Sequence, residues 1–183
     1  SLMVDRPAAQ EAAELARAHP GLGVGLHLEL CSSNPALAGW RYFFGAKERA
    51  GLEREIERQI SKLTSFGVKP THLDGHFHIQ AHPVIFPALC RAARKYGIPR
   101  VRLPGGDWRV SAGFSMASAL KSLGPSLTFA AMSSGLSRYA RGLCLPRTWG
   151  LVFTGQMKEE RLLVLLSLQY ISVYRQGPFL VEY

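Results

Sequence analysis

The chain has 183 residues, of which 47% are hydrophobic, so it holds enough apolar material for one globular domain with a sizeable core. Lys and Arg number 22 against 13 Asp and Glu, and the formal charge of +9 favours anionic partners such as nucleic acid, phosphate or an acidic membrane surface, without choosing among them. The three cysteines are odd in number and far apart, which excludes a disulfide framework and a Cys-x-x-Cys motif and favours a reducing, cytoplasmic compartment.

Helix and strand patterns alternate from the start of the sequence. Residues Ser1 to Val4 have the pattern of the end of a strand, which suggests that a segment is missing upstream. Residues Pro7 to His19 are rich in strong helix formers and are followed by Pro-Gly, so we expect a helix there. From Val24 to Cys31 leucines alternate with other residues at the period of two that a strand requires. His27 and Glu29 therefore share the face of this strand that carries no leucine.

The middle of the chain continues the alternation. Residues Lys47 to Phe66 carry a stripe of Leu and Ile at helical spacing and end before a glycine, which predicts a surface helix with one buried face. We expect a strand from Thr71 to Ile79, an apolar helix from Val84 to Tyr96 and a short strand from Val101 to Leu103. Weaker patterns predict helices in the ranges 114–123, 133–141 and 158–168 and a strand at 179–181.

This order of elements predicts the fold class. Strand-helix units in sequence favour parallel pairing with helices outside, so we expect an α/β fold. Periodicity alone does not separate an open sheet from a barrel. No repeat or linker divides the chain, so we expect a single domain over residues 1–183. The most apolar stretch, 162–173, is too short to span a bilayer as a helix.

Four of the six histidines lie between positions 72 and 82. His72, Asp74, His76 and His78 are spaced by two residues, so on an extended strand their side chains would all lie on one face. Imidazole nitrogens and carboxylate oxygens are ligands for Zn, Mn, Fe or, less often, Mg, and several on one face can converge on a single divalent ion. Same-face neighbours are roughly 6.5 to 7 Å apart at their Cα atoms, so one ligand should come from a neighbouring strand. His27 is the candidate.

The spacing leaves the roles within this cluster open. A histidine that does not bind the ion could fix the tautomer of a ligand, act as general acid or base, or bond a substrate, and Asp74 could orient any of them. An isolated histidine such as His19 is usually a surface or hydrogen-bonded residue. Several histidines and an aspartate on one buried face would be costly without a metal or substrate, so we predict a divalent-metal site. Cys31 lies near His27 in sequence, but a buried apolar cysteine is the commoner case.

Four segments, in order, resemble motifs of the YdjC-like carbohydrate deacetylases, and most of all the branch associated with hopanoid biosynthesis. They are Ser-Leu-Met-Val at 1–4, Val-Gly-Leu-His-Leu at 24–28, Pro-Thr-His-Leu-Asp-Gly-His-Phe-His at 70–78 and Val-Arg-Leu-Pro at 101–104. The resemblance is strong to residue 104 and fainter to residue 168, and the tail 169–183 diverges from the family.

The resemblance implies a distorted (β/α) barrel, here incomplete, and a metal-dependent hydrolase that removes acetyl groups from N-acetylated sugars. It implies that His27 and His76 are ligands of a divalent ion, Mg or Zn. The ion would polarise the acetamide carbonyl and activate a water that a carboxylate base deprotonates. Arg102 is a candidate substrate contact, although an arginine beside Leu-Pro is as often structural. The motif residues that would line the same pocket are His72, Asp74 and His78.

Two family motifs are not found in this sequence. The family begins with a strand that ends in Ala-Asp-Asp-Phe-Gly, which resembles the source of a carboxylate ligand and the catalytic base. Near its other end it has a Cys-His-Pro motif whose histidine resembles the general acid. We therefore expect this chain to be the middle of an enzyme or a degenerate relative, with base and acid residues absent. Glu29 is a weak candidate for a replacement carboxylate, since a solvated Glu on a polar strand face is commonplace.

Three functions follow from these patterns. The first is a hydrolase acting on an N-acetylated sugar or glycolipid, such as the N-acetylglucosaminyl head group of a hopanoid lipid. The second is an inactive metal- or sugar-binding module that keeps the pocket only. Nucleic-acid binding ranks last, because no nucleic-acid motif accompanies the charge. Peripheral contact with an anionic membrane is compatible with a basic and aromatic group whose residues are more often ordinary solvated charges and packed aromatics. They are Arg138, Arg141, Arg147, Tyr139 and Trp149.

Overall fold

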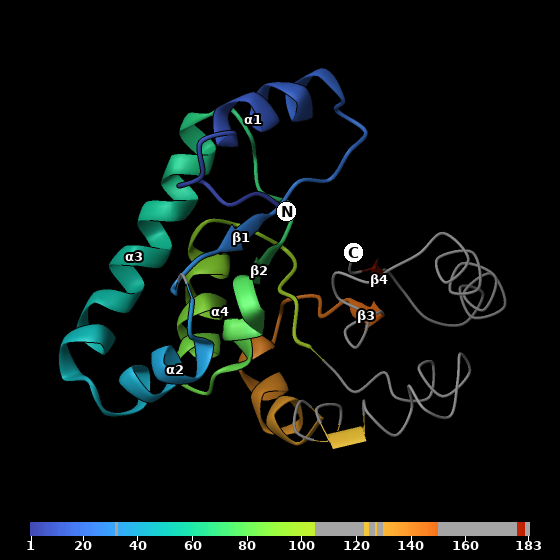
Figure 1. Cartoon of the computed structure of the whole chain (residues 1–183). Helices are drawn as coiled ribbons and strands as arrows, with labels where there is room; N and C mark the ends of the chain where they lie inside the picture. The colour runs from blue at the N-terminus through green and yellow to red at the C-terminus, as the bar shows by residue number, and fades with distance from the viewer. Residues whose placement is uncertain (32, 105–122, 125–126, 128–129, 150–178, 182–183) are drawn as a thin grey trace, which may run out of the picture. The chain divides into compact units, whose positions relative to one another are not determined.

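The computed structural model describes residues 1–31, 33–104, 123–124, 127, 130–149 and 179–181. It divides into two compact units, of which the first comprises Ser1–Arg102 and Leu136–Leu145 and the second Leu103–Gly135 and Pro146–Tyr183. The first unit contains all six histidines and most of the helices that the structure describes (Figure 1). Within the described residues no helix is both long and apolar enough to cross a membrane.

Two short parallel strands lie at the centre of the first unit. Strand β1 (Leu26–Leu28) pairs with β2 (Leu73–Gly75) in a register that places His27 opposite Asp74. Leu26, Leu28 and Leu73 are fully buried, so the leucine side of both strands faces the core. The alternation along β1 therefore confirms the prediction that His27 lies on the face away from the leucines.

Single parallel bridges extend this sheet on both sides. The neighbouring segments follow one another in chain order and run in the same direction, which agrees with strand-helix units and with an α/β fold. A short parallel sheet of this kind occurs in open sheets and in barrels, so the (β/α) barrel stays a prediction. The bridges join Leu2 to Leu26, Leu73 to Val101 and Arg100 to Cys144.

The predicted helices near the start and middle of the chain are confirmed. Helix α1 spans Ala9–Ala18 and α3 spans Ala46–Ser65. Gly67 has φ of +78°, the left-handed conformation that ends a helix most readily with glycine. Arg17 of α1 donates from Nη1 to the carbonyl of Phe66 at 2.6 Å and ties the two helix ends together. The predicted apolar stripe of α3 is buried, and consists of Leu52, Ile56, Ile60 and Leu63.

Helix α4 (Ile85–Lys95) completes the core of the first unit. It packs against α3, and the two helices lie beside the central strands (Figure 1). Its Phe86 and Leu89 are fully buried, and Gly97, with φ of +65°, ends the helix as predicted.

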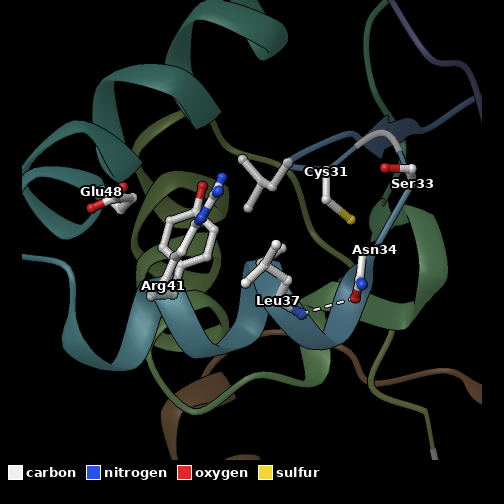
Figure 2. Close-up of a pocket in the computed structure, with 9 residues that line it drawn as sticks. Cys31, Ser33, Asn34, Leu37, Arg41 and Glu48 are labelled. Carbon is white, nitrogen blue, oxygen red and sulfur yellow. Dashed lines mark hydrogen bonds between the residues drawn. The ribbon is translucent and has the colours of Figure 1, made fainter.

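One helix was not predicted. Helix α2 (Pro35–Phe44) begins after Asn34, whose Oδ1 accepts a hydrogen bond from the backbone N–H of Leu37 at 3.0 Å (Figure 2). Asn at the N-cap followed by Pro in the first turn is a strong start signal. The Asn-Pro pair was therefore the signal in the sequence that could have revealed this helix.

The predicted strand Thr71 to Ile79 is wrong beyond Gly75. A 3₁₀ segment, η1 (His76–Ala81), follows β2, and Phe77 and His78 have φ of +53° and +56°. The turn buries Ile79 against the neighbouring helices, where η1 packs on α4, and this packing outweighs the extended conformation that alternation suggested. Spacing by two residues cannot reveal such a turn, because it records only which residues are polar.

Two further predicted strands are shorter than expected. Strand β1 stops at Leu28 because the side chain of Gln59 hydrogen-bonds the backbone of Glu29. Its Oε1 accepts from the N–H of Glu29 at 3.0 Å, and its Nε2 donates to the Glu29 carbonyl at 2.8 Å. The segment Val101 to Leu103 contributes one bridge, at Val101, instead of a full strand.

The later elements agree in part with the sequence. Residues 130–136 are helical and lead into η2 (Ser137–Ala140), which matches the helical pattern at 133–141. In the second unit β3 (Arg147–Trp149) pairs in parallel with β4 (Phe179–Val181), which confirms the predicted strand at 179–181. The predicted helix at 158–168 and nearly all of 114–123 lie outside the described residues.

Candidate functional site

The candidate site is built on a histidine-aspartate pair that joins β1 to β2. His27 Nδ1 lies 2.7 Å from Asp74 Oδ1, and Asp74 is 4% exposed. A carboxylate that accepts from Nδ1–H fixes the imidazole tautomer with the proton on Nδ1. The Nε2 atom of His27 then keeps its lone pair and is available to a metal ion or to a substrate proton.

The second oxygen of Asp74 has its own partners. Ser1 Oγ donates to Oδ2 at 2.9 Å, and Arg102 Nη1 lies 3.6 Å from the same oxygen. Burial alone would raise the pKa of Asp74, but the hydrogen bond from His27 and the charge of Arg102 bring it down to about 2. Asp74 is therefore ionised at neutral pH and acts only as an acceptor.

Arg102 is one of the buried residues of this cluster. It is 6% exposed, and its Nη2 donates to the carbonyl of Gly75 at 3.2 Å, so the side chain braces the end of β2. Burial lowers its pKa and the charge of Asp74 acts in the opposite direction. These contacts describe a positioning group, and a direct contact with substrate stays a prediction.

His76 stands beside His27 at the start of η1. The two ring centroids are 5.6 Å apart, with the rings edge to face at 68°. Burial, followed by the neighbouring His27, lowers the pKa of His76, so it is a neutral imidazole and a competent nitrogen donor at neutral pH. The ring of Phe77 lies 3.9 Å from that of His76 and is 45% exposed. Phe77 and His78 hold left-handed backbone conformations, which are uncommon for non-glycine residues and cluster at functional sites.

The other two histidines of the motif take different positions. His72 is buried, and its Nδ1 lies 3.0 Å from Thr71 Oγ1. His78 is half-buried, and its pKa is lowered to about 4 by burial and then by the positive charge of Arg102. Burial also lowers the pKa of His72. Both rings are therefore uncharged at neutral pH.

A close approach between the strands holds the His72 ring in place. A Cβ atom on Gly25 would lie 2.4 Å from His72 Cδ2 and 2.5 Å from the His72 carbonyl oxygen. Only glycine fits there without a shift of the strands.

The single face of four ligands that the spacing predicted does not form. The turn at His76 takes His76 and His78 out of the extended strand, so the one-face geometry ends at Asp74. Among the described residues no group of three or more His, Cys, Asp or Glu side chains is arranged to hold a metal ion. His27 and His76 supply two imidazole nitrogen donors, a set that suits Zn or a similar ion better than Mg, which prefers oxygen.

Two further candidates for metal ligands have other roles. The carboxylate of Glu29 forms an ion pair with Arg6. Burial and then the charge of Glu29 raise the pKa of the Cys31 thiol, which disfavours the thiolate that a metal requires.

Comparison with known sequences places this site in a family. Residues 1–173 match the sequence profile described as YdjC-like protein. The chain belongs to the YdjC-like family. This confirms the family that the four motifs predicted, and two of those motifs supply the facing residues His27 and Asp74.

Curated relatives of this chain carry deacetylase names. A carbohydrate deacetylase of Geobacillus stearothermophilus is 36% identical over 118 residues, which cover 54% of this chain and 45% of the relative. A carbohydrate deacetylase of Brevibacillus brevis is 34% identical over 118 residues, with 57% and 47% covered. A chitooligosaccharide deacetylase of Serratia marcescens is 34% identical over 113 residues, with 53% and 45% covered. The chain thus spans about half the length of the curated relatives it matches.

Sequence reasoning missed two residues that position the YdjC-like site. Gly25 had a readable signal, since a glycine inside a strand often marks a close backbone approach. Ser1 had none, because its hydroxyl reaches His27 and Asp74 only through the parallel pairing of Leu2 with Leu26.

Proposed function

We propose that the chain forms the metal- and substrate-binding part of a hydrolase that removes N-acetyl groups from an amino-sugar conjugate. The observation that carries the proposal is the Asp74–His27 pair across β1 and β2, with His76 beside it. The deacetylase names of the relatives support the reaction class and the sugar substrate.

Each residue of the cluster has a role in this proposal. His27, through Nε2, and His76 hold a divalent ion, for which the nitrogen donors favour Zn over Mg. Such an ion, when bound, supplies Lewis-acid polarisation of the acetamide carbonyl. Asp74 keeps the proton of His27 on Nδ1, and Arg102 with Ser1 keeps Asp74 in place. His78, neutral and half-buried, would hydrogen-bond substrate in this scheme.

The finer parts of the proposal rest on the motifs. The resemblance to the hopanoid-associated branch supports a glycolipid head group as substrate and peripheral contact with a membrane. The same resemblance supports the (β/α) barrel, and the order of the parallel segments is compatible with it. A reducing, cytoplasmic compartment is supported by Cys31, Cys90 and Cys144, which are all free thiols.

An inactive binding module is the second candidate. It is favoured by the two imidazole donors that the described residues provide without a third ligand, and by the engagement of Glu29 with Arg6. Such a module would bind metal or N-acetylated sugar without releasing acetate.

Metal titration and acetate release test the proposal together. We expect the chain to bind about one Zn²⁺, measured by calorimetry and by metal content after gel filtration, and His27→Ala and His76→Ala to weaken binding by more than about 100-fold. His19→Ala is the matched control, because His19 is exposed at the end of α1 and bonds only locally, to the Leu15 carbonyl. Acetate release from N-acetylglucosamine oligomers supports the hydrolase. Metal binding without acetate supports the module, and equal metal affinity in all four proteins would overturn both.

A further inference from the structure

Helix α2 exposes an apolar face to solvent. The exposed fractions are 48% for Leu37, 64% for Trp40, 45% for Phe43 and 66% for Phe44, while Ala38 is the buried residue of the helix. An ordinary surface helix turns its apolar side inward and its polar side to water. In α2 the large apolar side chains lie on the outside, and clustered exposure of this kind marks an interaction surface.

The aromatic side chains form one continuous patch. The ring centroids of Trp40 and Phe44 are 4.5 Å apart, and those of Phe43 and Phe44 are 6.2 Å apart. Leu37 lies one turn before Trp40, at the border between this patch and a pocket that it also lines. We call these four residues, Leu37, Trp40, Phe43 and Phe44, the α2 aromatic face.

The inner side of α2 buries little apolar area that would offset the exposure of the outer side. It borders a pocket of about 280 Å³, where Cys31 and Ser33 lie at one end and Arg41 and Glu48 at the other (Figure 2). A helix that lies over a pocket with polar lining gains little from burial. The N-cap Asn34 and a bond from Arg49 Nη1 to the Phe43 carbonyl at 2.7 Å hold the helix at its two ends.

The charges around the face are mainly positive. Lys47 and Arg49 follow the face in sequence at the start of α3, and Arg49 contacts the Phe43 carbonyl, whereas Arg41 and Glu48 lie at the pocket. The whole chain carries +9. Trp and Phe beside Arg and Lys are the combination that lies in the interfacial region of bilayers, with rings among the upper acyl chains and cations among anionic head groups. A second copy of the chain would instead bring like charges together at a two-fold interface.

We propose that the α2 aromatic face docks the protein on an anionic lipid bilayer. The face borders the end of η1, because the ring of Phe43 lies 4.1 Å from that of His82, and η1 is the segment that begins with His76. Docking would hold the His27–His76 pair beside the membrane surface. This link rests on the proposed function, and the docking assigns a surface to the membrane contact proposed there.

Vesicle co-sedimentation tests the docking. The chain is mixed with vesicles of phosphatidylcholine alone and of phosphatidylcholine with 30% phosphatidylglycerol. We expect binding to the anionic vesicles, with affinity reduced about tenfold or more in Trp40→Ser/Phe44→Ser and reduced further by 0.5 M salt. Leu15→Ser/Leu22→Ser is the matched control, because these leucines are 59% and 63% exposed elsewhere in the same unit. Circular dichroism verifies that all proteins are folded.

Three outcomes would overturn the proposal. They are equal binding by the two double variants, equal binding to neutral and anionic vesicles, and absence of binding together with a dimer in analytical ultracentrifugation that only Trp40→Ser/Phe44→Ser disrupts. Zinc affinity, measured on the same variants, should not change. Loss of vesicle binding with unchanged zinc affinity thus separates this proposal from the proposed function.

Discussion

At the scale of single residues, Asp74 organises the site. It is buried, faces His27 across the sheet and receives bonds from groups that are far apart in sequence. Its low pKa means that the folded state favours the ionised carboxylate. The Asp74–His27 pair therefore contributes both to the stability of the fold and to the orientation of the His27 ring.

Acid titration tests this link. The pKa of Asp74 falls from 3.8 to about 2 on folding, so its contribution is fully present above the unfolded value and is lost as the pH falls from about 4 to 2. We expect Asp74→Asn to lower the free energy of unfolding of the metal-free chain by about 2 kcal/mol at pH 7 and by less near pH 3. Urea unfolding across this pH range measures the difference. A loss that is the same at both pH values would contradict the assignment.

At the scale of elements, the residues just before β1 and β2, Gly25 and His72, approach more closely than a side chain on Gly25 would allow. The space that a Cβ would need is filled by the ring and carbonyl of His72. The same approach sets the register that pairs His27 with Asp74. Element packing thus depends on one glycine.

Paired glycine substitutions test this dependence. We expect Gly25→Ala to lower the free energy of unfolding by about 2 to 3 kcal/mol, because the strands must separate. Gly51→Ala is the control, since Gly51 lies in helix α3 with no atom within 4 Å of an added Cβ. It should raise the free energy of unfolding by about 0.5 to 1 kcal/mol through helix propensity. Thermal unfolding compares the two, and a stable Gly25→Ala protein would refute the tight approach.

At the scale of the whole molecule, the net charge of +9 has consequences of its own. Charge without a recognition motif gives weak, sequence-independent attraction to nucleic acid. In α2 and the first turn of α3, by contrast, cations occur together with exposed aromatic residues. This combination favours an anionic lipid surface over nucleic acid.

Oligonucleotide binding separates these two kinds of contact. We expect single- and double-stranded DNA of unrelated sequences to bind equally, with a dissociation constant no tighter than about 1 μM at physiological salt and with loss of binding at higher salt. Fluorescence anisotropy at several salt concentrations measures this. A preference for one sequence that survives at high salt would restore nucleic-acid binding as a function.

The sequence by itself determined three of the four α-helices in the first unit, the parallel order and the family. The stripe of Leu52, Ile56 and Ile60 and the stop at Gly67 depend on local periodicity and backbone preference, which a sequence records directly. The proximity of His27 to the motif at 72–78 was also predictable. Alternation places His27 on the strand face without leucines, and the cluster required one more ligand from a neighbouring strand.

Only the tertiary structure decided how the motif is used. The turn at His76 arises because burial of Ile79 and packing on α4 outweigh the period of two, and no local pattern reports that balance. The bond of Asp74 to His27, the support by Arg102 and the engagement of Glu29 with Arg6 join residues distant in sequence. Their geometry depends on strand register and side-chain packing, which exist only when the chain is folded.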